Sequence, residues 1–213
     1  MTKPALQRYR AYAQIERQRT TIRPGLLPRG LFRQAQLLMA RGRVAEALEK
    51  LDVTLDVSED VQVPERDRCV YHELRVYALA VLQRWEEAIA EAQGLRRHQT
   101  GAQAQVAHLI VDSVRAAAAL QREQADATAL SLQLLRGAAA LPWRRFLQQL
   151  PTAASRVLAI GWDAGVEREF VRRVALERKI APPQAFRSDW PWPLRIYAFG
   201  PLRIERDGVP LAD

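Results

Sequence analysis

The chain has 213 residues, of which 48% are apolar and 26% charged, so it can bury a core in one or two domains. It contains no run of 18 apolar residues, and its first residues lack the apolar core of a signal peptide, which argues against a membrane or secreted protein. Its single cysteine, Cys69, can form no internal disulfide, so we expect a cytoplasmic protein without a membrane partner.

The net charge of +8 is concentrated near the N-terminus. Residues 1–43 carry ten basic side chains against the single acid Glu16, a net charge of +9, and the rest of the chain sums to −1. A localised basic face can attract phosphates. The alternative is a set of solvated outer helix faces in a chain that uses Arg where Lys would serve.

The spacing of apolar residues, together with helix-breaking prolines and glycines, predicts that most of the chain is helical. A first helix is expected over roughly 4–20 and a second over 29–41, separated by Pro24-Gly25 and Pro28. The later breakers are a polar loop at Glu59 to Pro64, a helix end between Gly94 and Gly101, a helix start at Pro142, a restart at Pro151, a turn from Gly161 to Gly165 and a last helix ending near Lys179.

The helical part repeats with a period of 41 residues. Residues 35–48 read as the end of one helix, a turn at Gly42 and the start of a second helix. Shifts of 41, 82 and 123 residues return small or apolar residues at equivalent positions, and Glu87-Ala88 repeats Glu46-Ala47. The equivalent turn positions are Gln83, Gln124 and Gly165.

This pattern resembles the tetratricopeptide repeat, a helix–turn–helix unit that stacks into a superhelix with a continuous core. The usual tetratricopeptide period is about 34 residues, and 41 is nearer the range of HEAT repeats. We therefore expect an all-α fold, a tetratricopeptide-like repeat superhelix over residues 1–180. An irregular helical bundle is the alternative.

Residues that could carry chemistry do not form a catalytic or metal pattern. No glycine-rich phosphate loop occurs, and the three histidines (His72, His98 and His108) lack metal-ligand spacing with Cys69. Cys69 itself is expected at a buried helix position, as an inert thiol. His108 and Asp112 share a helix face, which suits a surface hydrogen bond better than a catalytic pair. We expect no enzyme, no metal site and no cofactor in this chain.

Five tryptophans divide into two groups. Trp85, Trp143 and Trp162 are expected to pack between helices. Trp190 and Trp192 are each followed by a proline, Pro191 and Pro193, which makes the segment stiff and extended. We expect these four residues, within a linker over 181–194, to hold a following domain against the helices.

The C-terminal residues predict short strands. Arg195 to Phe199 alternates polar and apolar residues, Gly200-Pro201 turns the chain, and Leu202 to Arg206 forms a second strand. Asp207-Gly208 is a strong hairpin-turn signal before Val209. An isolated hairpin is marginal in water, so residues 195–213 are expected to be the first strands of a truncated domain.

Taken in order, the runs 165–173, 180–183 and 190–197 resemble a junction in large ATP-dependent bacterial transcriptional regulators of the MalT-like type. In that family a tetratricopeptide-like sensor array leads into a response-regulator-type winged helix, often followed by a bacterial transcriptional activator domain. The resemblance implies that the strands open a winged helix, that ATP belongs to an upstream module, and that DNA is bound only through the missing remainder.

Three functional hypotheses follow. The first is the sensor and coupling segment of a transcriptional regulator, with a protein or small-molecule inducer on the concave face of the repeat array. The second is a free-standing helical-repeat adaptor that binds a protein or peptide. The third is nucleic-acid binding through the basic N-terminal helices. The ligand-binding residues of the array are not identified by the sequence.

Overall fold

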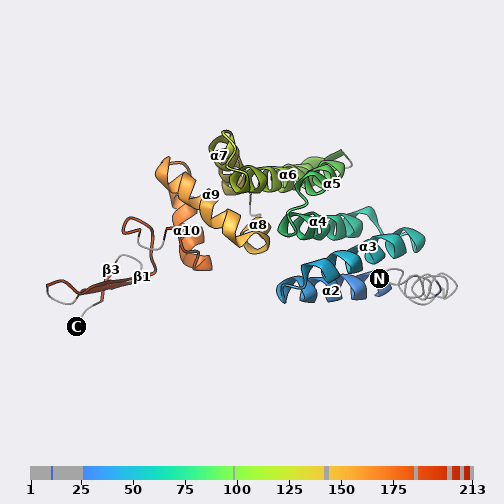
Figure 1. The fold of residues 1–213 in the computed structure, drawn as a ribbon, viewed down its shortest axis with the longest axis horizontal. Helices are drawn as coiled ribbons and strands as arrows, with labels where there is room; N and C mark the ends of the chain where they lie inside the picture. The colour runs from blue at the N-terminus through green and yellow to red at the C-terminus, as the bar shows by residue number, and fades with distance from the viewer. Residues whose placement is uncertain are drawn as a thin grey trace. The chain divides into compact units, whose positions relative to one another are not determined.

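The structure is a computed structural model, and it describes residue 11 and residues 26–97, 99–141, 144–184, 187–200, 203–206 and 209–211. The described chain is mostly helical and ends in a small three-stranded antiparallel sheet (Figure 1). Its contacts divide the protein into two compact units, Met1–Val114 and Arg115–Asp213. None of the described helices is both long and apolar enough to cross a membrane.

In the first unit, the helices between residues 26 and 97 each pack against the next one (Figure 1). The helices of this unit are α2 (Leu26–Ala40), α3 (Val44–Asp60), α4 (Glu65–Val81), α5 (Trp85–Arg97) and the first part of α6 (Gly101–Gln121). Pro28 was predicted to precede this first helix, but it lies within the first turn of α2 and is buried. Proline is tolerated there because the first backbone N–H groups of a helix have no partner inside the helix.

Alternate helices of the first unit also touch. The rings of Phe32 in α2 and Tyr71 in α4 are 4.9 Å apart, and Arg29 pairs with Asp67 at 2.7 Å. The Tyr77 hydroxyl of α4 lies 3.5 Å from the Ser113 hydroxyl of α6. The core therefore continues from one helical hairpin to the next.

The second unit contains the end of α6 and four further helices. These are α7 (Ala127–Ala140), α8 (Arg145–Gln149), α9 (Pro151–Asp163) and α10 (Arg168–Arg178). Pro151 begins α9, as predicted. Helix α9 packs against α7, α8 and α10, and Arg156 Nη1 donates a 2.7 Å hydrogen bond to the Leu120 carbonyl of α6.

Six of the described helix ends close with the same hydrogen bond, in which a backbone N–H just past the helix bonds to the carbonyl five residues earlier, at 2.9–3.0 Å. Four of them lie at the turns of the predicted period: Arg43 to Leu38, Arg84 to Leu79, Gln124 to Ala119 and Val166 to Gly161. The other two end α3 (Val63 to Ser58) and α10 (Ile180 to Ala175). The residue before each donor has a positive φ, and at the four turns of the period it is Gly42, Gln83, Glu123 or Gly165. This left-handed closure lets the next helix fold back.

The predicted period is correct for three of these turns and wrong for one. Gly42, Gln83 and Gly165 stand at the predicted positions, but the left-handed residue of the third turn is Glu123 and not Gln124. Buried Ala35, Val76, Ala117 and Leu158 keep the 41-residue spacing. The one-residue displacement is therefore confined to the third turn, and the buried residues of the preceding helices keep the 41-residue spacing.

One predicted loop differs from the structure, and one predicted helix end is confirmed. The segment Glu59 to Pro64 is not simply polar, because Val61 and Val63 are buried and α3 continues to Asp60. The helix end expected between Gly94 and Gly101 is the end of α5 at Arg97. The two compact units meet inside α6, so the domain boundaries expected at 180 and 194 stay predictions.

The sheet contains β1 (Leu194–Tyr197), β2 (Arg203–Arg206) and β3 (Val209–Pro210), in the order β1-β2-β3. Leu194 pairs with Arg206 and Ile196 with Ile204, as an antiparallel hairpin requires. Both predicted strands form, but the first begins one residue earlier, at Leu194, and ends at Tyr197 and not at Phe199.

Several predicted features lie outside the described residues. They are the first helix over 4–20, Pro24-Gly25, His98, Pro142, Trp143, Pro201 and the turn at Asp207-Gly208.

Candidate functional site

Trp190, the first residue of the predicted coupling segment, is held by the helices that precede it in the chain. Its side chain is 1% exposed. The indole Nε1 donates a 3.0 Å hydrogen bond to the Ile180 carbonyl, just after α10. The ring meets Trp162 of α9 edge to face, with centroids 6.1 Å apart. Such pairs add to the free energy of burying large aromatic surfaces.

Arg187 connects the start of this segment to α9. Its guanidinium bonds both carboxylate oxygens of Asp163 in α9 and both of Asp189, and lies 6.0 Å from the Trp190 ring centroid. Asp189 in turn accepts a 3.1 Å hydrogen bond from Trp162 Nε1. Hydrogen bonds from Arg187 and Trp162 lower the pKa of Asp189 to about 2.

The rest of the predicted coupling segment continues these contacts. Trp192 is half-buried, and its Nε1 donates a 2.6 Å hydrogen bond to the Arg187 carbonyl. Pro191 is buried, whereas Pro193 is exposed and directly precedes β1. Arg195, inside β1, donates from Nη2 to the Trp190 carbonyl at 2.8 Å. A continuous series of hydrogen bonds therefore connects α9 and α10 to the sheet within the second unit.

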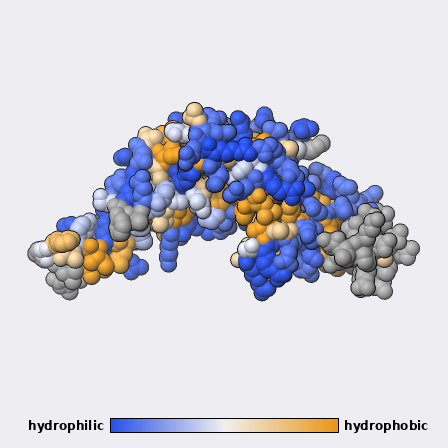
Figure 2. All heavy atoms as spheres, in the orientation of Figure 1, coloured by the Kyte–Doolittle hydropathy of each residue, from blue (hydrophilic) through white to orange (hydrophobic). Residues whose placement is uncertain are grey.

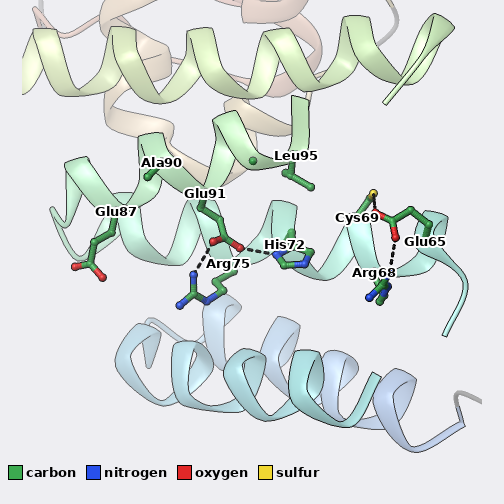
Figure 3. A pocket seen from close by; sticks show the side chains of 10 residues that line it. Glu65, Arg68, Cys69, His72, Arg75, Glu87, Ala90, Glu91 and Leu95 are labelled. Carbon is green, nitrogen blue, oxygen red and sulfur yellow. Dashed lines mark hydrogen bonds and ion pairs between the residues drawn. The ribbon is translucent and has the colours of Figure 1, made fainter. Parts of the chain in front are cut away.

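A second candidate site is a groove in the first unit that sequence reasoning did not find. It has a volume of about 860 Å³ and lies along α4 and α5 (Figure 3). Its walls are Glu65, Arg68, Cys69, His72, Arg75, Glu87, Ala90, Glu91, Gly94 and Leu95. Ala90 and Gly94 are one turn apart on α5, and a side chain added at Gly94 would meet only open space. Small residues on this face of α5 therefore leave room for the groove.

A polar network forms one end of the groove. The carboxylate of Glu91 lies 2.5 Å from His72 Nδ1 and 2.9 Å from Arg75 Nη1, as Figure 3 shows. Arg75 also bonds Asp52 of α3 at 2.8 Å, so the network ties three helices together. Burial raises the pKa of Glu91, but the hydrogen bond from His72 and the charge of Arg75 outweigh it and hold the pKa below its usual value.

Cys69 lies at the other end of the groove. Contrary to the prediction of a buried position, the thiol is half-buried, and it accepts a hydrogen bond from the Gln99 side-chain amide. Burial, followed by the charge of Glu65, raises the pKa of the thiol. The thiol form is therefore favoured over the reactive thiolate.

The remaining sequence candidates have structural partners. His108 Nδ1 lies 2.7 Å from the Ala104 carbonyl, one turn back in α6. Trp85 is buried and Trp162 half-buried, in line with packing roles. The repeated glutamates each form a two-pronged pair with the arginine three residues before, Arg43 with Glu46 and Arg84 with Glu87.

Of the ten basic residues in the N-terminal excess, four are described. Arg29 pairs with Asp67 and Arg43 with Glu46, while Arg33 bonds Gln36 and Arg41 is exposed. Two of the four charges are thus compensated within the fold. No group of His, Cys, Asp and Glu suited to a metal ion occurs among the described residues.

Sequence reasoning found the tryptophans but missed Arg187 and the groove. Arg187 lies between the prolines at 182 and 183 and those at 191 and 193, and it precedes Asp189 by two residues, a local charge pair that could have drawn attention. The groove combines residues whose spacing along each helix was visible, but whose pairing across helices was not. Comparison of the chain with family models, curated proteins and solved structures gave no match.

Proposed function

We propose that this chain is the sensor and coupling segment of a transcriptional regulator, with a helical-repeat array that controls an adjacent winged-helix domain. The observation that carries the proposal is the joint at Trp190. A fully buried indole fixed to the helices, with Arg195 of β1 bonded to its carbonyl, provides a firm connection between helices and sheet. A displacement of α9 or α10 would be transmitted to β1.

The repeat array is supported by the recurrence of one closure. The four turns of the expected period share one backbone hydrogen bond, which also ends α3 and α10, and buried Ala35, Val76, Ala117 and Leu158 recur every 41 residues. First helices of neighbouring hairpins touch at Phe32 and Tyr71 and at Tyr77 and Ser113. Stacked hairpins of this kind build extended surfaces for partners.

The sheet supports the winged-helix part of the proposal. Pairing places Leu194, Ile196, Ile204, Val209 and Leu211 on one mainly apolar face, which also carries Arg206 between Leu194 and Val209. Four of the apolar side chains are at least 50% exposed, and apolar spheres are visible on the sheet in Figure 2. The opposite face is polar and internally paired, with Arg203 over the Tyr197 ring at 4.2 Å. A sheet with one uncovered, mainly apolar face suits a domain whose helices pack on it.

For the inducer or partner we propose the groove along α4 and α5. Three carboxylates, two guanidiniums and an imidazole line it beside the apolar Ala90 and Leu95, which suits a polar peptide or a small molecule with both charges. The helical-repeat adaptor remains the second candidate, because the same groove would serve it.

The decisive experiment reads the gene beyond codon 213 and then tests the joint. The proposal expects an in-frame winged helix, and W190A with W192A in that protein should change induced transcription from a reporter promoter. W85A, in the first unit, is the control for loss of an indole away from the joint. An absent winged helix, or unchanged induction in W190A/W192A, contradicts the proposal and favours the adaptor.

A further inference from the structure

Residues 187–195, here called the strap, are attached to the helices by a small set of discrete contacts. Arg187 bonds Asp163 and Asp189, and Trp162 bonds Asp189. Trp190 then bonds the Ile180 carbonyl. Further along, Trp192 bonds the Arg187 carbonyl, so the strap is also folded on itself.

Arg187 is the member of this set on which the others converge. Its side chain is 13% exposed, whereas those of Asp163 and Asp189 are 61% and 60% exposed. It is the only described residue of the strap whose side chain reaches a carboxylate of α9. Its carbonyl also receives the Trp192 indole, so both ends of the residue hold the strap closed.

The helices do not depend on these contacts for their core. Buried Val157, Leu158, Val171 and Val174 belong to the cores of α9 and α10, whereas Arg187 bonds the exposed carboxylates of Asp163 and Asp189. Breaking the Arg187 pairs would therefore loosen the strap before it loosens the helices, as expected for a local opening of low free energy.

We propose that Arg187 is a latch: its pairing with Asp163 and Asp189 keeps the strap closed on α9 and α10, and its release frees the sheet from the helices while they stay folded. As regulation of the coupling site, this inference rests on the function proposed above. Pro191 and Pro193 restrict the released strap, which favours reclosure in the same geometry.

The two exposed carboxylates make the latch accessible from solvent. Ions, or a cationic group of a partner, can compete for Asp163 and Asp189, because exposed ion pairs are screened by salt. Burial of the Trp190 ring is not weakened in this way. A salt titration therefore distinguishes the contribution of the Arg187 ion pairs from that of the aromatic packing of Trp190.

The test follows indole N–H exchange in the chain labelled with ¹⁵N-tryptophan. In R187M the indole N–H groups of Trp190 and Trp192 should exchange about tenfold faster, because the variant lacks the charged hydrogen bonds that stabilise the closed strap. Backbone amides of α9 and α10 should keep their protection. R187K should be intermediate, because an ammonium group cannot bridge two carboxylates with a planar fork.

R173M is the matched control, because Arg173 lies on α10 over the Phe170 ring and should leave both indoles unchanged. In the unmodified chain, raising NaCl from roughly 0.05 to 0.5 M should speed the same two indoles. Unchanged indole exchange in R187M, or equal acceleration of the α9 and α10 amides, overturns the latch. Neither result bears on whether a winged helix follows, so the two proposals fail separately.

Discussion

Glu91 shows how an acidic side chain can lie 19% exposed in a helical core. Two cationic or hydrogen-bonding groups of the neighbouring helix, His72 and Arg75, compensate for its desolvation. Arg75 is itself 24% exposed and shared with Asp52. Removing one member of such a network leaves the others buried without their partner, which costs more than the pair contributes.

The variant E91Q should therefore lower the free energy of unfolding by about 1–3 kcal/mol at pH 7. Because the pKa of Glu91 is lowered in the folded state, its contribution is present above the pKa of the unfolded state and is lost as the pH falls through the folded value. The difference between E91Q and the unmodified chain should shrink toward pH 3. Urea unfolding followed by circular dichroism at pH 7, 5 and 3 measures it.

E87Q is the matched control for this experiment. Glu87 lies one turn earlier on α5, and its pair with Arg84 is exposed. Exposed pairs contribute little, so E87Q should unfold close to the unmodified chain. A pH-independent difference for E91Q would refute the linkage.

At this scale the sequence predicted single residues better than pairs. The sequence singled out Trp190 and Trp192 because a proline follows each of them. The network around Glu91 could not be predicted in this way, because its bonded partners are 16 to 23 residues apart in the chain and belong to three helices. Periodicity shows which residues share a helix face, but not which face of another helix lies opposite. For the same reason the half-buried position of Cys69 was missed.

At the scale of the elements, the helix ends are the most regular feature of the chain. Each of the four equivalent turns places one residue at positive φ, but only Gly42 and Gly165 are glycines there. Gln83 and Glu123 hold the same conformation with a Cβ, which is strained. The turn at Gln83 contains no glycine and still lies at its predicted position, whereas the third turn is displaced by one residue, which a fixed period cannot predict.

Exchanging these residues should change stability in opposite directions. Q83G should stabilise the chain by about 0.5–1 kcal/mol, because it removes strain at a φ of 59°. G42A should destabilise by about 1 kcal/mol, since open space surrounds Gly42 and only its φ of 72° is unfavourable. Thermal unfolding followed by circular dichroism distinguishes the two.

G30A provides the reference for these variants. Gly30 lies inside α2 with a helical backbone and nothing near its added Cβ, so alanine should be neutral or stabilising there. Destabilisation by Q83G would show that its side chain makes a compensating contact.

At the scale of the whole molecule, the chain divides into two compact units, and their cores are tied by different residues. The first unit depends on the network around Glu91. In the second, α7 and α9 approach closely at Gly161, where an added Cβ would overlap buried Leu135. The sequence predicted the helices of both units from periodicity, but the division inside α6 carries no breaker and could not be predicted.

G161A should destabilise the second unit by about 1–3 kcal/mol through overpacking. Combined with E91Q, the two losses should add to within about 0.5 kcal/mol, because the sites share no partner. Amide exchange should place the effect of G161A in α7, α9 and α10, and that of E91Q in α3 to α5. A clear departure from additivity would show energetic coupling between the units.

The prolines around the sheet have a consequence for association. Strand β1 is one edge of the sheet, and Pro193 directly precedes it; β3 is the other edge, and it contains Pro210. An edge strand with free N–H groups can template pairing with another chain, and proline removes such a donor. Pro193 and Pro210 thus limit strand-to-strand aggregation of a sheet whose mainly apolar face is exposed.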